Sequence, residues 1–345
     1  MSSNIGHLFT QSFVTLSHMT TLIAILAAAI PTAIYGMFVW WLDRYEKEPP
    51  WLIAAAFLWG SLPAIGLALL FELGLQIPLA RSPIGPDLAA WGLAPLVEEP
   101  VKALALVGLF LLARHEFDGP LDGIVYGSLV GFGFSMTENA LYFLRYRDEL
   151  GGLFWVRGVF FGLNHALFSS MVGLALGAVR YRRSGRAAVT AFFGGLVLAI
   201  LFHALHNYAV RYQFAGLFFS WLIQSSGVIV VLAIAVLAWR NERRWIEQEL
   251  GDEVRAGVLS AADYAEVASP ARRVRRQLRT LLTGGWSRYR QTRRMHQLAT
   301  ELAFCKSQLR LEDRYRTCAE RDELRGELTA LRALIERDEQ IWGEL

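Results

Sequence analysis

Seven long apolar stretches alternate with short polar segments over the first two thirds of the chain. They lie at residues 19–42, 51–75, 89–113, 121–144, 153–179, 187–210 and 214–239. A helix needs about 20 residues to cross the hydrocarbon core of a bilayer, and each stretch is long enough. The pattern predicts an all-α fold, a multi-pass transmembrane helical bundle of about seven spans.

Charged side chains divide the chain into two parts. Residues 1–239 hold 13 basic and 13 acidic side chains, whereas residues 240–345 hold 21 basic and 18 acidic ones. We therefore expect a transmembrane domain at 1–239 and a charged helical tail at 240–345. The chain is 54% hydrophobic, and its two cysteines both lie in the tail. This composition excludes collagen, disulfide scaffolds and wholly disordered chains.

Basic residues in the short loops predict how the bundle is oriented. The loops after the first, third and fifth stretches carry seven Lys and Arg residues, and the opposite side carries four. Because positively charged loops face the cytoplasm, we expect a cell-membrane protein with an external N-terminus and a cytoplasmic C-terminal tail. Residues 1–18 contain no Lys or Arg, so the first stretch is interpreted as a retained anchor rather than a cleaved signal peptide.

The tail carries three patterns of its own. Ser260 with Asp263 predicts a capping box before a short helix, which Pro270 then ends. Residues 272–294 contain nine arginines and no acid, which fits either contact with anionic lipid headgroups or a solvated charged face. An apolar repeat with a phase break follows at Leu298, Leu302, Cys305, Leu309, Leu324, Leu328, Leu331 and Ile335. This repeat is typical of a short coiled coil, and it predicts either a dimer or an intrachain helical hairpin.

Ionisable and amide side chains interrupt four of the apolar stretches. An ionised group at the centre of a membrane helix costs about 2.5 to 3.5 kcal/mol, so each one needs a function or a partner. Because the helices alternate in direction, Glu98, Glu138, His165 and His203 are expected at one level, roughly 10 to 18 Å below the outer surface at about 1.5 Å per residue. The candidate site residues are Glu98, Glu99, Lys102, Glu138, His165, His203 and Asn207. We expect them to converge on a shared hydrated pocket.

Backbone features near these residues favour close packing and a polar cavity. Gly119, Gly123, Gly127 and Gly131 recur at every fourth position and form a strip that lets another helix approach closely. Prolines flank the glutamate pair at residues 95 and 100. A proline inside a helix frees carbonyl groups, which lipid tolerates only where protein or water satisfies them.

The residue types leave several functions open. A carboxylate that activates water, with histidine and amide groups to stabilise an oxyanion, can hydrolyse an amide bond without a cofactor. The same residues match a divalent metal site such as zinc, with ligands drawn from Glu98, Glu99, Glu138, His165 and His203. They also match the proton relay of a transporter, although no inverted repeat supports it. An inactive scaffold that acts through its tail is a further alternative.

Several motifs resemble those of one known protein family. LVEEPVK at 96–102 and GFGFSMTEN at 131–139 are similar to the EExxK and FxxxE motifs of the PrsW family of intramembrane proteases. NHALF at 164–168 and HALHN at 203–207 are similar to its later histidine motifs. With DRYEKEP at 43–49 and DGIVYG at 122–127, the resemblance covers roughly residues 30–210. The family is distantly related to the CAAX prenyl protease and bacteriocin-processing group, from whose pattern this chain departs at Lys102 and Glu138.

The resemblance implies a glutamic-type intramembrane endopeptidase. It implies that Glu98 or Glu99 activates water, that Lys102 orients the pair, that Glu138 and His165 complete the centre, and that His203 and Asn207 stabilise the oxyanion. His206 lies outside the motif and is interpreted as packing. Relatives are linked to cleaving an anti-sigma factor. The expected partners are a membrane-embedded protein or peptide substrate, the lipid bilayer and a second copy bound through the tail, but no nucleic acid. No cofactor is expected, with a divalent metal such as zinc as the alternative.

Overall fold

The described part of the chain consists of helices joined by short turns and irregular connections. A computed structural model describes residues 18–42, 48–79, 81, 85–113, 116–180, 182, 184–312 and 315–343. These residues form two compact units, one that ends at Ala235 and one that begins at Val236. The predicted all-α class is confirmed. Residues 43–47 of the DRYEKEP motif, and the loop residues 114 and 183 used to predict orientation, lie outside the described residues.

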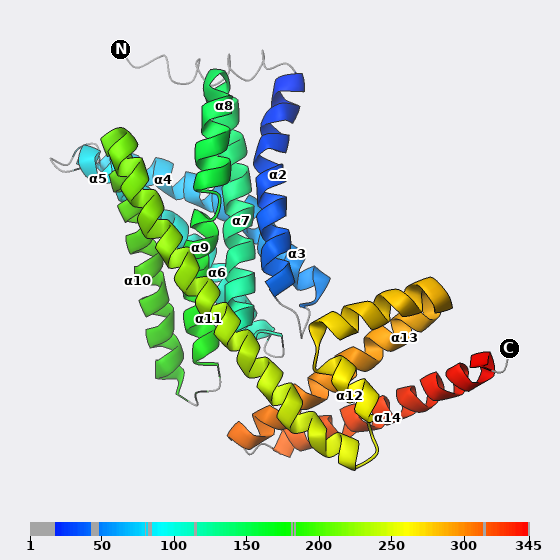
Figure 1. Ribbon diagram of the computed structural model, residues 1–345. Coiled ribbons are helices and arrows are strands. Elements are labelled where there is room, and N and C mark those ends of the chain that lie inside the picture. Colours follow the sequence, from blue (N-terminus) through cyan, green and yellow to red (C-terminus); the bar gives the residue numbers. More distant parts are fainter. Residues whose placement is uncertain are drawn as a thin grey trace. The chain divides into compact units, whose positions relative to one another are not determined.

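The first unit is a bundle of helices (Figure 1). Prolines at the first position start α3 and α7, where a missing backbone N–H costs nothing. In chain order the elements are α2 (His18–Leu42), α3 (Pro50–Trp59), the π-helix η1 (Gly60–Ala64), α4 (Ile65–Leu79), α5 (Gly85–Trp91), α6 (Leu93–Leu112), α7 (Pro120–Arg145), the short η2 (Arg147–Glu149), α8 (Leu150–Leu153), the π-helix η3 (Phe154–Phe160), α9 (Asn164–Ala178), α10 (Gly185–Ala209), η4 (Val210–Tyr212) and α11 (Gln213–Arg255).

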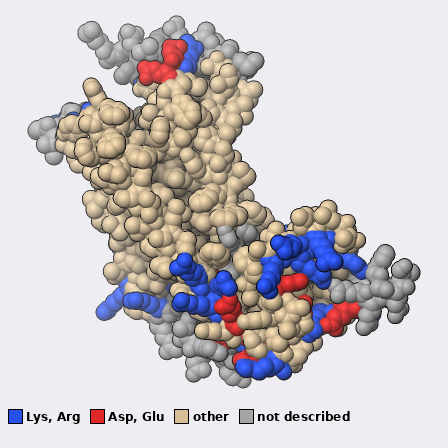
Figure 2. Space-filling view, viewed as in Figure 1, with Lys and Arg blue, Asp and Glu red and all other residues tan. Residues whose placement is uncertain are grey.

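Four segments of the described chain are long and apolar enough to cross a membrane. They are Thr20–Leu42, Pro50–Gln76, Arg147–Ala178 and Gly185–Arg255. The outer face of the bundle exposes large apolar side chains such as Leu70, Leu104 and Phe193, and Figure 2 shows a largely uncharged surface between its two ends. Such a surface suits lipid rather than water.

Three predicted stretches are not single α-helices. In the stretch at 51–75, the π-helix η1 lies between α3 and α4. In the stretch at 89–113, α5 ends at Trp91 and α6 begins at Leu93. In the stretch at 153–179, the π-helix η3 is followed by a turn, and α9 begins at Asn164. Gly162 lies in this turn, where a Cβ atom would stand 2.2 Å from the carbonyl oxygen of Gly158. The approach is too close for any other residue, and the turn places His165 in the first turn of α9 rather than deep inside a long helix.

Helices α7 and α9 pack backbone against backbone along the predicted glycine strip. A Cβ atom on Gly123 would stand 2.1 Å from the carbonyl oxygen of Gly173, and one on Gly131 would stand 2.2 Å from that of His165. Only glycine permits this approach. The strip prediction is therefore confirmed, and the contact fixes the backbone of His165 against α7.

The second unit contains the end of α11, α12 (Ala261–Val267), α13 (Pro270–Glu312) and α14 (Tyr315–Gly343). The predicted capping box is confirmed, since Ser260 Oγ accepts from Asp263 N at 3.0 Å and Asp263 Oδ2 accepts from Ser260 N at 3.1 Å. Helix α13 is interrupted at Gly285, whose φ of 70° divides it into two arms.

Both halves of the apolar repeat in the tail contribute to one core within the chain. Leu298, Leu302 and Leu328 are buried there, and Leu324, Leu331 and Ile335 pack against them. Cys305 is buried. The side chains of Leu309 and Cys318 lie outside the described part. The repeat thus serves intrachain packing, and a dimer through the tail stays a prediction.

Candidate active site

Helix α6 supplies two buried carboxylates and a cation that contacts both of them. Glu98 and Glu99 are 6% and 1% exposed, and Lys102 is fully buried one turn later. The Lys102 ammonium donates to Glu99 Oε1 at 2.6 Å and to Glu98 Oε2 at 3.4 Å. Positions three and four residues apart share one helix face, which is why a single lysine reaches both glutamates.

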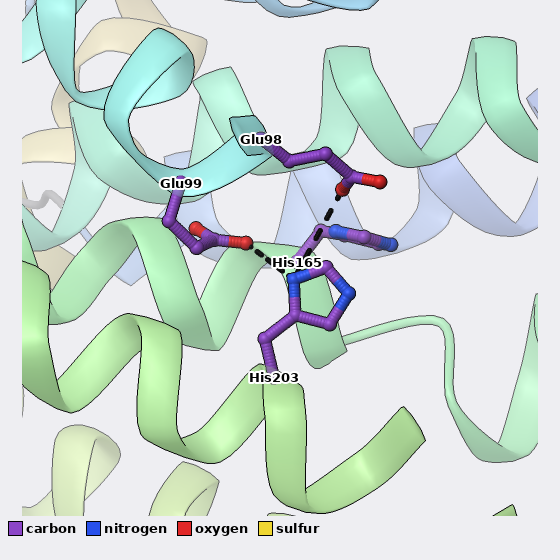
Figure 3. A group of neighbouring side chains, drawn as sticks. All are labelled: Glu98, Glu99, His165 and His203. Carbon is purple, nitrogen blue, oxygen red and sulfur yellow. Dashed lines mark hydrogen bonds and ion pairs between the residues drawn. The ribbon is translucent and has the colours of Figure 1, made fainter. Parts of the chain in front are cut away.

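Helices α9 and α10 bring two imidazoles to the same group. Lys102 Nζ lies 3.0 Å from His165 Nδ1, so the ammonium donates to this ring nitrogen. His203 Nδ1 lies 2.7 Å from Glu99 Oε1 and 4.0 Å from Glu98 Oε2, and its N–H donates to Glu99. Figure 3 shows these carboxylates and imidazoles pointing toward one another from three helices. The structure thus brings together five of the residues that were expected to converge, namely Glu98, Glu99, Lys102, His165 and His203.

Glu138 of α7 lies beside this group and holds His165 in place. Its Oε2 accepts from His165 Nε2 at 3.0 Å and from Arg157 Nη2 at 2.8 Å. Arg157 also donates through Nε to Asn139 Oδ1 at 2.9 Å, and its guanidinium lies 3.8 Å from the centre of the Tyr142 ring. These contacts fix the orientation of the His165 ring. Its Nε2–H donates a hydrogen bond to Glu138, which leaves Nδ1 without a proton on the side of Lys102.

Arg157 is the site residue that the sequence analysis missed. It lies in the π-helix η3, inside the apolar stretch at 153–179. π-helical turns inside membrane or core helices are frequent at functional sites, because the extra residue redirects a side chain. A guanidinium within a spanning segment was itself a signal, since it requires a partner as much as the glutamates do.

Aromatic rings enclose the polar group. The Lys102 ammonium lies 4.2 Å from the centre of the Phe134 ring, and this ring centre is 5.3 Å from that of His165. Phe168 stacks on His203 at a centre-to-centre distance of 4.9 Å. A low-polarity wall strengthens every ion pair inside it.

Asn207 and His206 lie on the same helix as His203 but have different surroundings. Asn207 is partly exposed, and within the described chain it makes no hydrogen bond or ion pair with the other predicted site residues. His206 Nδ1 lies 2.7 Å from Ser220 Oγ of α11, and its ring packs on Phe161 at 4.7 Å. The two residues are therefore separate from the hydrogen-bonded group around Lys102.

Four residues of this group offer donors that suit a metal ion. Glu98, Glu99, His165 and His203 are all buried, and one ligand atom from each lies within 4.8 Å of the others. Glu99 Oε2 is buried and lacks a hydrogen-bond partner among the described residues, so it has a free acceptor site. Carboxylate oxygens and imidazole nitrogens are zinc ligands, and a second-layer carboxylate such as Glu138 commonly holds a metal-binding histidine. The donor set therefore fits a divalent metal, although the Lys102 ammonium contacts three of the four residues, Glu98, Glu99 and His165.

Comparison with known proteins gives one consistent family. A family model described as PrsW family intramembrane metalloprotease matches residues 48–240. Protease PrsW of Clostridioides difficile (strain 630) is 26% identical over 219 residues, which cover 62% of this chain and 86% of the relative. Protease PrsW of Oceanobacillus iheyensis is 30% identical over 195 residues, which cover 55% of this chain and 84% of the relative. Protease PrsW of Geobacillus kaustophilus is 36% identical over 141 residues, which cover 40% of this chain and 59% of the relative. No solved structure matches the chain.

Proposed function

Since the chain belongs to the PrsW family of intramembrane metalloproteases, we propose that its peptidase site is the buried group of Glu98, Glu99, His165 and His203. Membrane protease function follows from the family and from the relatives. The transporter alternative finds no support in these comparisons. The observation that carries the assignment is the convergence of two carboxylates and two imidazoles within 4.8 Å inside an apolar bundle.

We assign the general base to Glu98. Glu99 is held by two short contacts, at 2.6 Å to Lys102 and 2.7 Å to His203. Glu98 has only longer ones, at 3.4 Å and 4.0 Å to the same two residues. A carboxylate held less tightly by cations and donors is the stronger proton acceptor, so Glu98 is better suited to take a proton from water.

The remaining residues position this pair. Lys102 contacts both glutamates and offsets one of their two negative charges. Glu138, itself held by Arg157, orients His165 through its Nε2. His203 keeps its Nδ1–H on Glu99, and Asn207 follows one turn later on α10. For a centre without a metal, we assign His203 and Asn207 to the stabilisation of the oxyanion that forms when the peptide carbonyl is attacked.

Glu99, His165 and His203 would hold a divalent metal such as zinc, because catalytic zinc sites use three protein ligands and keep one position open. When bound, such an ion lowers the pKa of water and polarises the substrate carbonyl. This division leaves Glu98 as the base beside the three ligands. Glu138 would then act as the carboxylate that orients a metal-binding histidine.

For the whole chain we propose seven spans. Five of them are α2, α6, α7, α10 and the apolar part of α11. The other two are each formed by a pair of helices, α3 together with α4 and α8 together with α9. The protease domain would be residues 1–239 and the tail 240–345, with the tail in the cytoplasm by the distribution of basic loops. The proposed substrate is a membrane protein of the anti-sigma-factor kind, cut within the membrane.

The test begins by comparing membrane peptides from cells with and without the wild-type chain, to identify a cleaved substrate. Cleavage of that substrate is then measured for Glu98→Gln and Glu99→Gln. Removal of a general base lowers the rate by roughly 100- to 10,000-fold, and we expect at least this loss in Glu98→Gln. Glu149→Gln is the matched control, since Glu149 is exposed in η2. Full activity in both site variants with normal protein levels would refute the proposal.

A further inference from the structure

The first arm of α13, residues 270–284, exposes a continuous apolar stripe. Val274, Leu278, Leu281 and Leu282 are 64%, 53%, 37% and 76% exposed, and Trp286 just after the kink is 61% exposed. Together these five residues are called the α13 stripe. Val274, Leu278, Leu281 and Leu282 are spaced so that they share one face of the helix, and Trp286 follows four residues after Leu282. Single exposed apolar residues are common, but a row of five on one helix marks an interaction surface.

Internal packing uses a face of this arm that adjoins the α13 stripe. Arg273 is buried and donates through Nε to Val267 O at 2.9 Å and through Nη2 to Thr300 Oγ1. Gln277 Nε2 lies 3.2 Å from His296 Nδ1 of the second arm. The first arm therefore lies antiparallel to the second, with positions 273 and 277 turned inward. The α13 stripe follows the neighbouring face and points away from the core of this unit.

The stripe is bordered by positive charge. Residues 270–294 contain nine arginines and no acidic residue. Arg272, Arg275 and Arg279 are exposed on the first arm, and Arg290 and Arg293 are exposed on the second. Figure 2 shows a dense patch of Lys and Arg side chains over α13. An apolar face with tryptophan beside a row of arginines is the pattern of helices that lie in the interface of anionic membranes.

We propose that the α13 stripe docks on the anionic lipid surface of the bilayer that holds the first unit. The apolar side chains and Trp286 would enter the boundary between headgroups and acyl chains, and the neighbouring arginines would bind lipid phosphates. Charge complementarity argues for this occupant, because nine arginines without an acid repel a second copy of the same surface. Chain continuity adds to it, since only residues 240–269 separate the apolar part of α11 from α13. The proposal concerns the tail alone and is independent of the peptidase site.

The test uses the full chain in lipid nanodiscs. A fluorophore sensitive to its environment is attached at Leu282→Cys, with Cys305→Ala and Cys318→Ser to remove the native thiols. The nanodiscs contain brominated phosphatidylcholine, alone or mixed with phosphatidylglycerol, and bromine quenches a fluorophore that enters the acyl region. We expect quenching with phosphatidylglycerol, loss of quenching in high salt, and roughly a tenfold or greater fall in the lipid-bound fraction in Arg275→Glu/Arg279→Glu.

Matched controls lie on α14. Leu334 is 42% exposed, and Arg337 is exposed near it. A fluorophore at Leu334→Cys should stay in water, and Arg337→Glu should leave quenching at position 282 unchanged. Three results would overturn the proposal: no quenching in either lipid, equal quenching in phosphatidylcholine alone, or self-quenching between fluorophores that shows a second copy on the stripe.

Discussion

Lys102 Nζ lies 2.6 Å from Glu99 Oε1 within α6, and the two side chains are 0% and 1% exposed. A buried ion pair gains little over a neutral pair of equal size, but the loss of one partner leaves an uncompensated charge. The geometry therefore makes Lys102 essential to the glutamates even though it offers no ligand atom to a metal. The lysine also donates to His165 at 3.0 Å, so it joins three residues of the site.

We expect Lys102→Met to abolish peptide cleavage and to lower the free energy of unfolding by about 3 to 5 kcal/mol, because Glu99 would keep a buried charge without its cation. Thermal unfolding in detergent and a cleavage assay measure the two effects. Arg243→Met is the control, since Arg243 pairs with Glu247 at 2.8 Å on an exposed surface and should cost about 1 kcal/mol or less. An equally stable Lys102→Met protein would mean that Glu99 is protonated in the native state.

Arg157 and Glu138 should act as one unit through His165. We expect Arg157→Gln and Glu138→Gln each to reduce activity by roughly 10- to 100-fold, the range found for groups that orient a reacting or metal-binding residue. The double variant should lose little more than either single one, because both changes release the same imidazole. The coupling free energy between the two residues is obtained by measuring kcat and KM for the wild type, the two single variants and the double variant. Strictly multiplicative losses would show that the two residues act independently.

Gly131 should be intolerant of any side chain, because its Cβ would stand 2.2 Å from the carbonyl oxygen of His165. We expect Gly131→Ala to lower stability by about 1 to 3 kcal/mol. Activity should fall further, since displacing a reacting group by about 1 Å can cost roughly 100-fold. Gly194→Ala in α10 is the control, because a Cβ atom there meets nothing within 4 Å. Wild-type activity in Gly131→Ala would show that α9 shifts without disturbing His165.

The two histidines of the HALHN motif should differ in metal binding. His203 lies in the donor group, whereas His206 faces Ser220 at 2.7 Å. We expect the purified chain to bind a divalent metal, and expect His203→Ala to lose both metal and activity while His206→Ala keeps them. Elemental analysis measures the metal directly, and chelation followed by addition of zinc tests its role. A wild-type chain that stays fully active after its metal is removed would instead favour catalysis by glutamate alone.

Much of the fold follows from local properties of the chain. Long apolar stretches become helices because lipid leaves no other partner for the backbone, so α2, α7 and α10 begin and end close to their predicted limits. The level of the polar residues also follows from helix rise and alternating direction, and the group around Glu98 and His203 lies together as expected. The repeat of glycines at every fourth position predicted the close contact of α7 with another helix.

The sequence by itself determined which side chains had to avoid lipid, because the cost of burying a charge depends on residue type and depth alone. Only the tertiary structure decided which of them meet. The π-helix η3 and the turn before α9 aim Arg157 at Glu138 and His165 at Lys102, and Asn207 stays apart on the same helix as His203. Such pairings depend on the rotation of each helix about its axis, which packing against several neighbours sets at once and no local pattern encodes.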